Sequence, residues 1–349
     1  MKLVFSKSEL SKAVGIVMKA VPTRTTMNIL ECILIDATTN VIKFTSNDME
    51  LGIETIVEGE IIEKGKVAIE AKLFSEIVRR FPDNEVTIST DANYTSLITC
   101  EKSKINIAGK SGEDFSFLPI IDKDKMITIS QFNLKEIINQ TIFSTAPNDN
   151  NKMMTGELFE VSDNTLKVVG LDGHRIAIRS IQLEGRADDV KAVVPGKTLQ
   201  EISKLMSTDA ENMVNIYFTN NHILFEFDNT IVVSRLIEGE YFKINQMLSS
   251  DYETKVVINK KEFIGSIDRA NLLITESEKK PIIINITDGS LEVTVNSSKG
   301  KFNEDINIKK EGKDLMIGFN PKFLMDALRV IDDENVDIYL VNPKAPCFI

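Results

Sequence analysis

The sequence predicts an α+β protein of three similar domains, because one pattern of helix, turn and strand occurs three times. In each copy a lysine lies early in a short helical stretch, an acidic or Asn-containing turn follows, and an alternating strand ends the segment. The copies are "EAKLFSEIVRRFPDNEVTIST" from Glu70, "PGKTLQEISKLMSTDAENMVNIYFT" from Pro195 and "NPKFLMDALRVIDDENVDIYLV" from Asn320. Their lysines, Lys72, Lys197 and Lys322, are separated by 125 residues in both intervals. A period this long indicates duplicated domains.

Two further sets of segments complete each domain. A second helical set is "SELSKAVGIVMKAV" from Ser8, "FNLKEIINQTIFSTA" from Phe132 and "KEFIGSIDRANLLIT" from Lys261. A hairpin set is "VIKFTSNDMELGI" from Val41, "TLKVVGLDGHRIAI" from Thr165 and "SLEVTVNSSKGKF" from Ser290. We therefore predict helix, strands, helix, strands in each of three domains, 1–125, 126–250 and 251–349. The third copy has fewer strand-like runs after its second helix, so we expect it to be short of its last strand, with a tail that is truncated or incomplete.

Composition restricts the class of protein. The 349 residues are 42% hydrophobic and 27% charged, which is typical of folded domains with real cores. No apolar run approaches the roughly 20 residues of a membrane-spanning helix, and the N-terminus turns polar too early for a secretory signal. The three cysteines have neither CxxC nor Cys/His spacing, so we expect no metal, no cofactor and a reducing cytoplasm.

Positive charge is concentrated in the predicted helices. The whole chain has a formal net charge of −11, yet the windows 7–24, 71–81, 131–146, 196–207, 259–275 and 320–331 together carry +8. A helix-lined basic surface on an acidic body would suit phosphate. Lys and Arg are also good helix formers, so any helix tends to collect them. The bias nevertheless disfavours the alternative of a repeat scaffold that does not bind DNA.

The stretch "LDGHRIAI" at 171–178 holds one of only two histidines. Asp172 and His174 allow a small-molecule hydrolase or transferase, but no recurring carboxylate, histidine or nucleophile partner accompanies them. The Asp-Gly pair is what a tight hairpin turn requires. Only the second of the three copies has His and Arg at this turn, which favours a binding site specific to the second domain.

These repeats, together with "DGHRIA" (172–177), "SRLIEGEY" (234–241), "MNILECILI" (27–35) and "NPKAPCFI" (342–349), resemble the bacterial DNA polymerase III beta subunit, the replicative sliding clamp, from Met1 to Ile349. The resemblance implies the DNA clamp fold, with helices lining a central hole and antiparallel sheets outside. It implies a ring closed by a head-to-tail homodimer. It also implies a non-catalytic processivity factor that encircles duplex DNA and tethers the replicative polymerase and other replication and repair proteins.

Helix geometry agrees with a dimer. Helices packed about 10 Å apart would leave a hole of roughly 5 Å radius if six formed the ring, and roughly 14 Å if twelve did. Only the larger hole admits duplex DNA with a layer of water. Because one chain supplies six helices, two chains are needed.

The resemblance also carries over individual residues. For DNA contact it implies Arg24, Lys12, Lys72, Lys197 and Asn148, the last in place of the family's glutamine. For a partner-peptide pocket between domains two and three it implies Gly173, His174, Arg175 and Pro346, with Leu171, Met154, Phe242, Gln246 and Met247 where the family has other side chains. We interpret Gly173 as allowing close approach of a peptide backbone.

The dimer contact implied by the resemblance joins domain one to domain three. Ile105 and Ile107 match an apolar strand edge, and Leu272 and Leu273 match its counterpart at a helix end. We expect all four to be exposed in a single chain. The expected partners are double-stranded DNA, a second copy, the polymerase III alpha subunit, the clamp loader and other proteins with a clamp-binding motif, in the cytoplasm at the nucleoid and not at a membrane.

Overall fold

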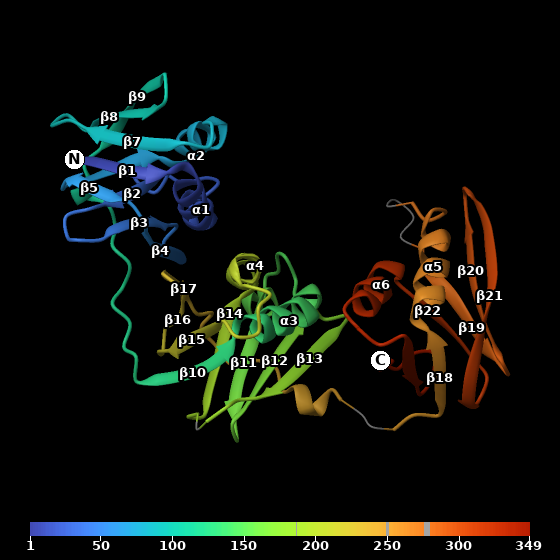
Figure 1. The fold of residues 1–349 in the computed structure, drawn as a ribbon. Coiled ribbons are helices and arrows are strands. Elements are labelled where there is room, and N and C mark those ends of the chain that lie inside the picture. The colour runs from blue at the N-terminus through green and yellow to red at the C-terminus, as the bar shows by residue number, and fades with distance from the viewer. Residues whose placement is uncertain (186, 249–250, 276–279) are drawn as a thin grey trace. The chain divides into compact units, whose positions relative to one another are not determined.

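The computed structural model describes residues 1–185, 187–248, 251–275 and 280–349. Its contacts divide the chain into two compact units, Met1–Glu240 and Tyr241–Ile349. The first unit contains the first predicted domain and the second as far as Glu240, and the second unit contains the rest of the chain, including the third (Figure 1). None of the helices in these ranges is long and apolar enough to cross a bilayer.

The first predicted domain has two helices and nine strands. The helices are α1 (Lys7–Val17), which continues into the 3-10 turn η1 (Met18–Ala20), and α2 (Ala71–Arg80). The strands are β1 (Lys2–Ser6), β2 (Cys32–Asp36), β3 (Ile42–Asn47), β4 (Leu51–Val57), β5 (Glu60–Glu63), β6 (Lys66–Glu70), β7 (Glu85–Thr90), β8 (Thr95–Cys100) and β9 (Ser103–Lys110). A 3-10 turn, η2 (Gly112–Asp114), follows.

The second predicted domain repeats this order. Its helices are α3 (Gln131–Thr141), which continues into η3 (Ile142–Ser144), and α4 (Gly196–Leu205), with η4 (Lys152–Thr155) between them. Its strands are β10 (Lys125–Ser130), β11 (Gly156–Ser162), β12 (Thr165–Leu171), β13 (Ile176–Gln182), β14 (Val190–Pro195), β15 (Met213–Phe218), β16 (His222–Phe227) and β17 (Thr230–Arg235).

The second unit begins with η5 (Ile244–Gln246) and has the helices α5 (Lys260–Asn271) and α6 (Pro321–Arg329). Its six strands form one antiparallel sheet in the order β22-β19-β20-β21-β18-β23. They are β18 (Thr254–Asn259), β19 (Ile282–Thr287), β20 (Ser290–Ser297), β21 (Gly300–Gly312), β22 (Leu315–Phe319) and β23 (Asn335–Leu340).

The six predicted helices are confirmed among the described residues, and their starts follow local sequence. Ser6, Ser130 and Asn259 each precede a first helix and accept a hydrogen bond from the backbone N–H three residues later. Glu70 and Asn320 cap two of the second helices through their side chains, whereas Pro195 before α4 cannot. Such caps satisfy N–H groups that the helix itself leaves without partners.

The helices pack in pairs against the sheets. Helix α1 contacts α2, α3 contacts α4, and α5 contacts α6. Their apolar faces close over the inward side chains of the strands, and each unit has its own continuous core. Basic residues on the opposite helix faces are therefore left at the surface.

One antiparallel sheet of 13 strands runs through the first unit, in the order β10-β15-β16-β17-β4-β3-β2-β6-β9-β8-β7-β1-β5. The two predicted domains meet where β17 pairs with β4, from Thr230 opposite Thr55 to Ser234 opposite Leu51 (Figure 1). The hydroxyls of Thr55 and Thr230 are 2.9 Å apart at this seam. Lys19 forms an ion pair across it with Glu201 on α4, at 3.3 Å. The seam therefore joins domain one to domain two by strand pairing and by charge.

A carboxyl group lies in the core of domain two. Glu157 on β11 is 0% exposed, and neither carboxyl oxygen has a hydrogen-bond partner among the described residues. Burial raises the pKa of this carboxyl to about 8, and the nearby Thr141 hydroxyl offsets only part of that shift. The hydroxyl of Thr141 donates a hydrogen bond to the carbonyl oxygen of Ile137, at 2.7 Å. Glu157 is thus held in its neutral form at neutral pH.

Candidate functional site

The predicted DNA-contacting residues are exposed on the helices and on the loops that follow them. Lys12 is on α1 and Lys72 is on α2, so both belong to the same packed helix pair. Lys197 is in the first turn of α4. Arg24 comes shortly after η1, and Asn148 comes shortly after η3. All five are accessible to a phosphate backbone.

A surface depression brings two of these residues together. It has a volume of about 510 Å³ and is lined by residues 147–150, Lys152, Thr155, Pro195 and Lys197. Asn148 and Lys197 both border it, although they are far apart in the sequence. Lys152 adds a second ammonium group, which the sequence had not pointed to, and Asp149 adds a carboxylate. The depression thus offers donors and positive charge to an anion.

Lys197 also has a partner in domain one. Its Nζ atom is 2.7 Å from Oδ2 of Asp48, which lies in the hairpin turn between β3 and β4. The other oxygen of Asp48 accepts hydrogen bonds from the N–H groups of Glu50 and Leu51, at 3.0 and 2.7 Å. One carboxylate therefore closes its own turn and also binds a helix of the next domain.

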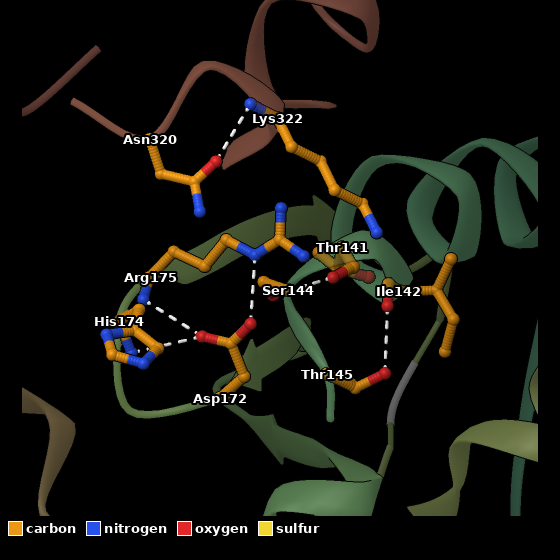
Figure 2. Close-up of polar contacts among 9 residues, drawn as sticks. All are labelled: Thr141, Ile142, Ser144, Thr145, Asp172, His174, Arg175, Asn320 and Lys322. Carbon is orange, nitrogen blue, oxygen red and sulfur yellow. Dashed lines mark hydrogen bonds and ion pairs between the residues drawn. The ribbon is translucent and has the colours of Figure 1, made fainter. Parts of the chain in front are cut away.

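The turn from Asp172 to Arg175 joins β12 to β13. Asp172 Oδ1 accepts hydrogen bonds from the N–H groups of His174 and Arg175, at 3.0 and 3.1 Å (Figure 2). Its Oδ2 accepts one from Arg175 Nε, at 3.0 Å. Both oxygens of Asp172 are therefore engaged, and the contact with His174 goes through the backbone N–H of that residue.

Arg175 is held from two sides. Asp172 binds its Nε, and its guanidinium carbon is 5.3 Å from the centre of the Phe143 ring. A guanidinium over an aromatic face gains a cation–π attraction while its remaining N–H groups keep their direction. His174, by contrast, is exposed. The turn therefore presents an arginine in a defined orientation, with the histidine at the surface beside it.

The backbone conformation at position 173 gives a reason for glycine within the chain itself. Gly173 has φ +82°, a backbone conformation that side chains with a Cβ rarely adopt. A Cβ added there would meet only the terminal methyl of Met154, at 3.9 Å, which is ordinary contact. The backbone conformation therefore favours glycine here, and close approach of a peptide backbone at Gly173 stays a prediction.

The other predicted pocket residues lie in two different units. Met154 is half-buried, and Leu171 is buried at the end of β12, on the face opposite to the core residues Leu166 and Val168. Phe242, Gln246, Met247 and Pro346 belong to the second unit, where Phe242 packs edge to face with Tyr241 and the other three are exposed. A pocket formed jointly by these residues stays a prediction.

The expectation that four apolar residues at the dimer contact are exposed is wrong in part. Leu272, which ends α5, is 73% exposed. Ile107 is only 8% exposed because it points into the core of domain one, and Ile105 and Leu273 also pack against the cores of their units. What β9 does offer is backbone: residues 103–108 pair with β8 on one side, and β6 pairs only with Gly109 and Lys110.

Across the described residues, no group of three or more His, Cys, Asp or Glu is arranged to hold a metal ion. The candidate polar sites are the depression with its two lysines, the pair of Asp48 with Lys197, and the turn that contains Arg175.

Family models cover almost the whole chain. Residues 1–119 match the N-terminal domain of the DNA polymerase III beta subunit, residues 128–243 its central domain and residues 245–349 its C-terminal domain. The chain belongs to this family. It is 35% identical over 339 residues to the "Beta sliding clamp" of Staphylococcus epidermidis, an alignment that covers 94% of this chain and 90% of that protein. The Staphylococcus aureus clamp is 34% identical over the same coverage.

Solved clamp structures share the fold. A protein from Eubacterium rectale assigned to the DNA polymerase III beta subunit is 66% identical with a TM-score of 0.97, covering 100% of this chain and 95% of that one. The sliding clamp of Bacillus subtilis is 31% identical with a TM-score of 0.95, covering 99% and 94% of the two chains. The three-domain clamp fold expected from the sequence is therefore confirmed.

Within this family fold, sequence reasoning had missed two residues of the candidate surface. The repeat aligns Asp48 with Asp172, 124 residues later. No residue near Asp48 in the sequence indicated that its second oxygen would bind Lys197. Lys152 begins the short 3-10 turn η4, where the sequence has no helical or strand period, so no nearby residue indicated that it would lie beside the depression.

Proposed function

We propose that this protein is a DNA sliding clamp, in which two chains close head to tail around duplex DNA and hold the replicative polymerase on it. Membership of the beta subunit family carries the proposal. The exposed basic residues support it, because lysines and arginines on helix faces attract phosphates without reading bases. A protein that slides needs that indifference to sequence.

The seam between β4 and β17 provides a template for closing the ring. In the repeat, β9 corresponds to β17, and the start of β21 corresponds to β4. Residues 103–108 of β9 have one edge without a strand partner among the described residues, and so do residues 300–307 of β21. We expect these two edges to pair between copies, as β17 and β4 pair within one, because unpaired edges readily accept another strand. On this view the domains are 1–125, 126–250 and 251–349.

The turn at Asp172 supports a binding role and not a catalytic one. A general base needs a free carboxylate oxygen or imidazole nitrogen within reach of a substrate. Both oxygens of Asp172 are already engaged by the turn and by Arg175. We propose that Arg175, with Gly173 and His174, forms one wall of the partner-peptide pocket, completed by Met154, Leu171, Phe242, Gln246, Met247 and Pro346.

The partners that follow from this proposal are duplex DNA, the polymerase III alpha subunit, the clamp loader and other proteins with a clamp-binding motif. The chain would itself catalyse no reaction. It would act in the cytoplasm, at the nucleoid.

The first test is the mass in solution. Light scattering after size exclusion should give about 78 kDa at micromolar concentration, twice the 39.1 kDa of one chain. Leu272→Asp should give the mass of one chain, because a charge at this exposed apolar position would be buried unpaired at the contact. Met316→Asp, at another exposed apolar position of the same unit, is the matched control and should stay dimeric. A monomeric wild type rejects the ring.

The second test is topological. Protein loaded on a nicked circular plasmid should stay on it through gel filtration and should be lost when one restriction cut makes the DNA linear. Equal retention on the circular and linear forms would contradict encirclement.

A further inference from the structure

Asp48 binds a lysine that we expect to contact DNA. The side chain of Asp48 is 8% exposed, whereas that of Lys197 is 68% exposed. The carboxylate is thus largely shielded from water, and the ammonium that it holds at 2.7 Å lies at the surface. A partner that approached from solvent would meet Lys197 first.

The carboxylate is held by its own turn, whereas the lysine reaches it through a flexible side chain. Asp48 Oδ1 is tied by the N–H groups of Glu50 and Leu51, and Leu51 begins β4, which is paired with β17. Lys197 reaches Asp48 through a flexible four-carbon stem from the first turn of α4. If the pair separates, the ammonium moves and the carboxylate stays.

A second place for this ammonium is close by. Lys197 borders the depression that Asn148 and Lys152 also line. A phosphate oxygen in that depression would offer Lys197 the same kind of acceptor as Asp48 does. An ion pair with one partner this exposed is weak and readily exchanged.

We propose that Asp48 competes with the DNA backbone for Lys197, and so limits how strongly this part of the protein binds duplex DNA. This inference rests on the proposed function, in which Lys197 faces the DNA. The lysine would pass between the carboxylate and successive phosphates, and binding would stay weak enough for sliding. Removing the Asp48 charge should therefore strengthen binding to DNA, although it breaks an ion pair between domains.

The test variant is Asp48→Asn in the full-length protein. Its amide oxygen can still accept the two N–H groups of the turn, while the negative charge is gone. Binding to a fluorescent duplex oligonucleotide is measured by anisotropy at several salt concentrations. One additional phosphate contact should steepen the slope of log K against log salt by about 0.9. Over a fourfold range of salt, the affinity of Asp48→Asn should therefore change roughly 3.5-fold more than that of wild type.

Two controls separate competition from a general change of charge. Glu50→Gln removes an exposed charge from the same turn without touching Lys197, and it should leave the slope near that of wild type. In a Lys197→Ala background, Asp48→Asn should change the slope no more than Glu50→Gln does. If Asp48→Asn lowers the melting temperature, Asp48→Ser is measured in its place. Serine occupies the corresponding turn of the third copy, where the Ser297 hydroxyl accepts a hydrogen bond from the Lys299 N–H, at 3.1 Å.

The possible outcomes are distinct. If wild type binds the duplex but Asp48→Asn has the slope of wild type or of Glu50→Gln, the competition is refuted and the proposed function stands. The same holds if the increase persists without Lys197. If wild type does not bind the duplex at any salt concentration, the DNA-binding part of the proposed function has failed, and this inference fails with it.

Discussion

The hairpin turns at Asp48 and Asp172 have the same backbone hydrogen bonds and different ion pairs. In each, Oδ1 of the aspartate accepts the N–H groups two and three residues later. Oδ2 then binds Lys197 of the next domain in the first turn, and Arg175 of its own turn in the second. A duplicated local motif has thus become a contact between domains in one copy and an oriented arginine in the other.

The difference follows from which cation is nearest. The domain-one turn continues with Met49, Glu50 and Leu51, which supply no positive charge, and the pairing of β17 with β4 brings α4 within reach. The domain-two turn contains its own arginine. Identical carboxylates therefore acquire different roles without any change in the turn.

At one corresponding core position the domains differ in the polarity of the buried side chain. Ile33 lies opposite Ile69, Glu157 opposite Val194, and Ile282 opposite Phe319, so the strand partners recur every 124 or 125 residues. Ile33, Glu157 and Ile282 are all 0% exposed. Domain two alone buries a carboxyl where the other two bury isoleucine.

The largest effect is expected from Glu157→Ile, which restores the residue of the other domains. Burial raises the pKa of Glu157 to about 8 from an ordinary 4.5, so between these values the unfolded chain releases a proton that the folded chain keeps. Stability of the wild type should therefore fall as pH rises through this window, by about 1.4 kcal/mol per pH unit and roughly 3 kcal/mol by pH 7. Glu157→Ile should lack this loss.

The measurement is urea unfolding at pH 5, 7 and 8.5, followed by circular dichroism for wild type and variant. The stability gained by Glu157→Ile should be smallest at pH 5 and largest at pH 8.5. Parallel pH profiles for the two proteins would show that Glu157 does not titrate as its burial requires.

The next effect concerns the arginine turn. Arg175→Ala should weaken binding of a polymerase-derived peptide by about 2 kcal/mol, roughly thirtyfold, if Arg175 is an anchor of the pocket. Asp172→Asn keeps the oxygen that closes the turn but loses the charge that orients Arg175, so it should cost about 1 kcal/mol, roughly fivefold. Fluorescence anisotropy of the labelled peptide gives both values.

Asp48→Asn is the matched control in domain one, since it makes the same chemical change in the corresponding turn, and it should leave peptide affinity unaltered. Equal affinity of wild type and Arg175→Ala would place the partner site elsewhere on the protein.

The smallest effect comes from the residue that follows each aspartate. Met49 has φ +75° where Gly173 has φ +82°, so domain one holds a strained side chain at the position where domain two has glycine. Met49→Gly should raise the free energy of unfolding by up to about 1 kcal/mol, and Gly173→Ala should lower it by about 1 kcal/mol. Thermal melts of both variants check the opposite signs, and two changes of the same sign would contradict this account.

The sequence alone determined the threefold pattern, the six helices with their caps, and the tight turns at Asp48 and Asp172. Each of these depends on hydrogen bonds and apolar spacing within about ten residues, which a single stretch of chain contains. The family resemblance added the function and the names of residues at the candidate sites.

Only the tertiary structure decided what these local pieces meet. The pairing of β17 with β4, the ion pair of Asp48 with Lys197 across 149 residues, and the burial of Ile107 all depend on which elements come to lie side by side. Alternation along β9 indicated an apolar strand, but it could not distinguish a side chain facing the core from one facing a partner. The packing of segments that are distant in the sequence determines which strand edges pair and which ion pairs form between domains. No short stretch of sequence contains that information.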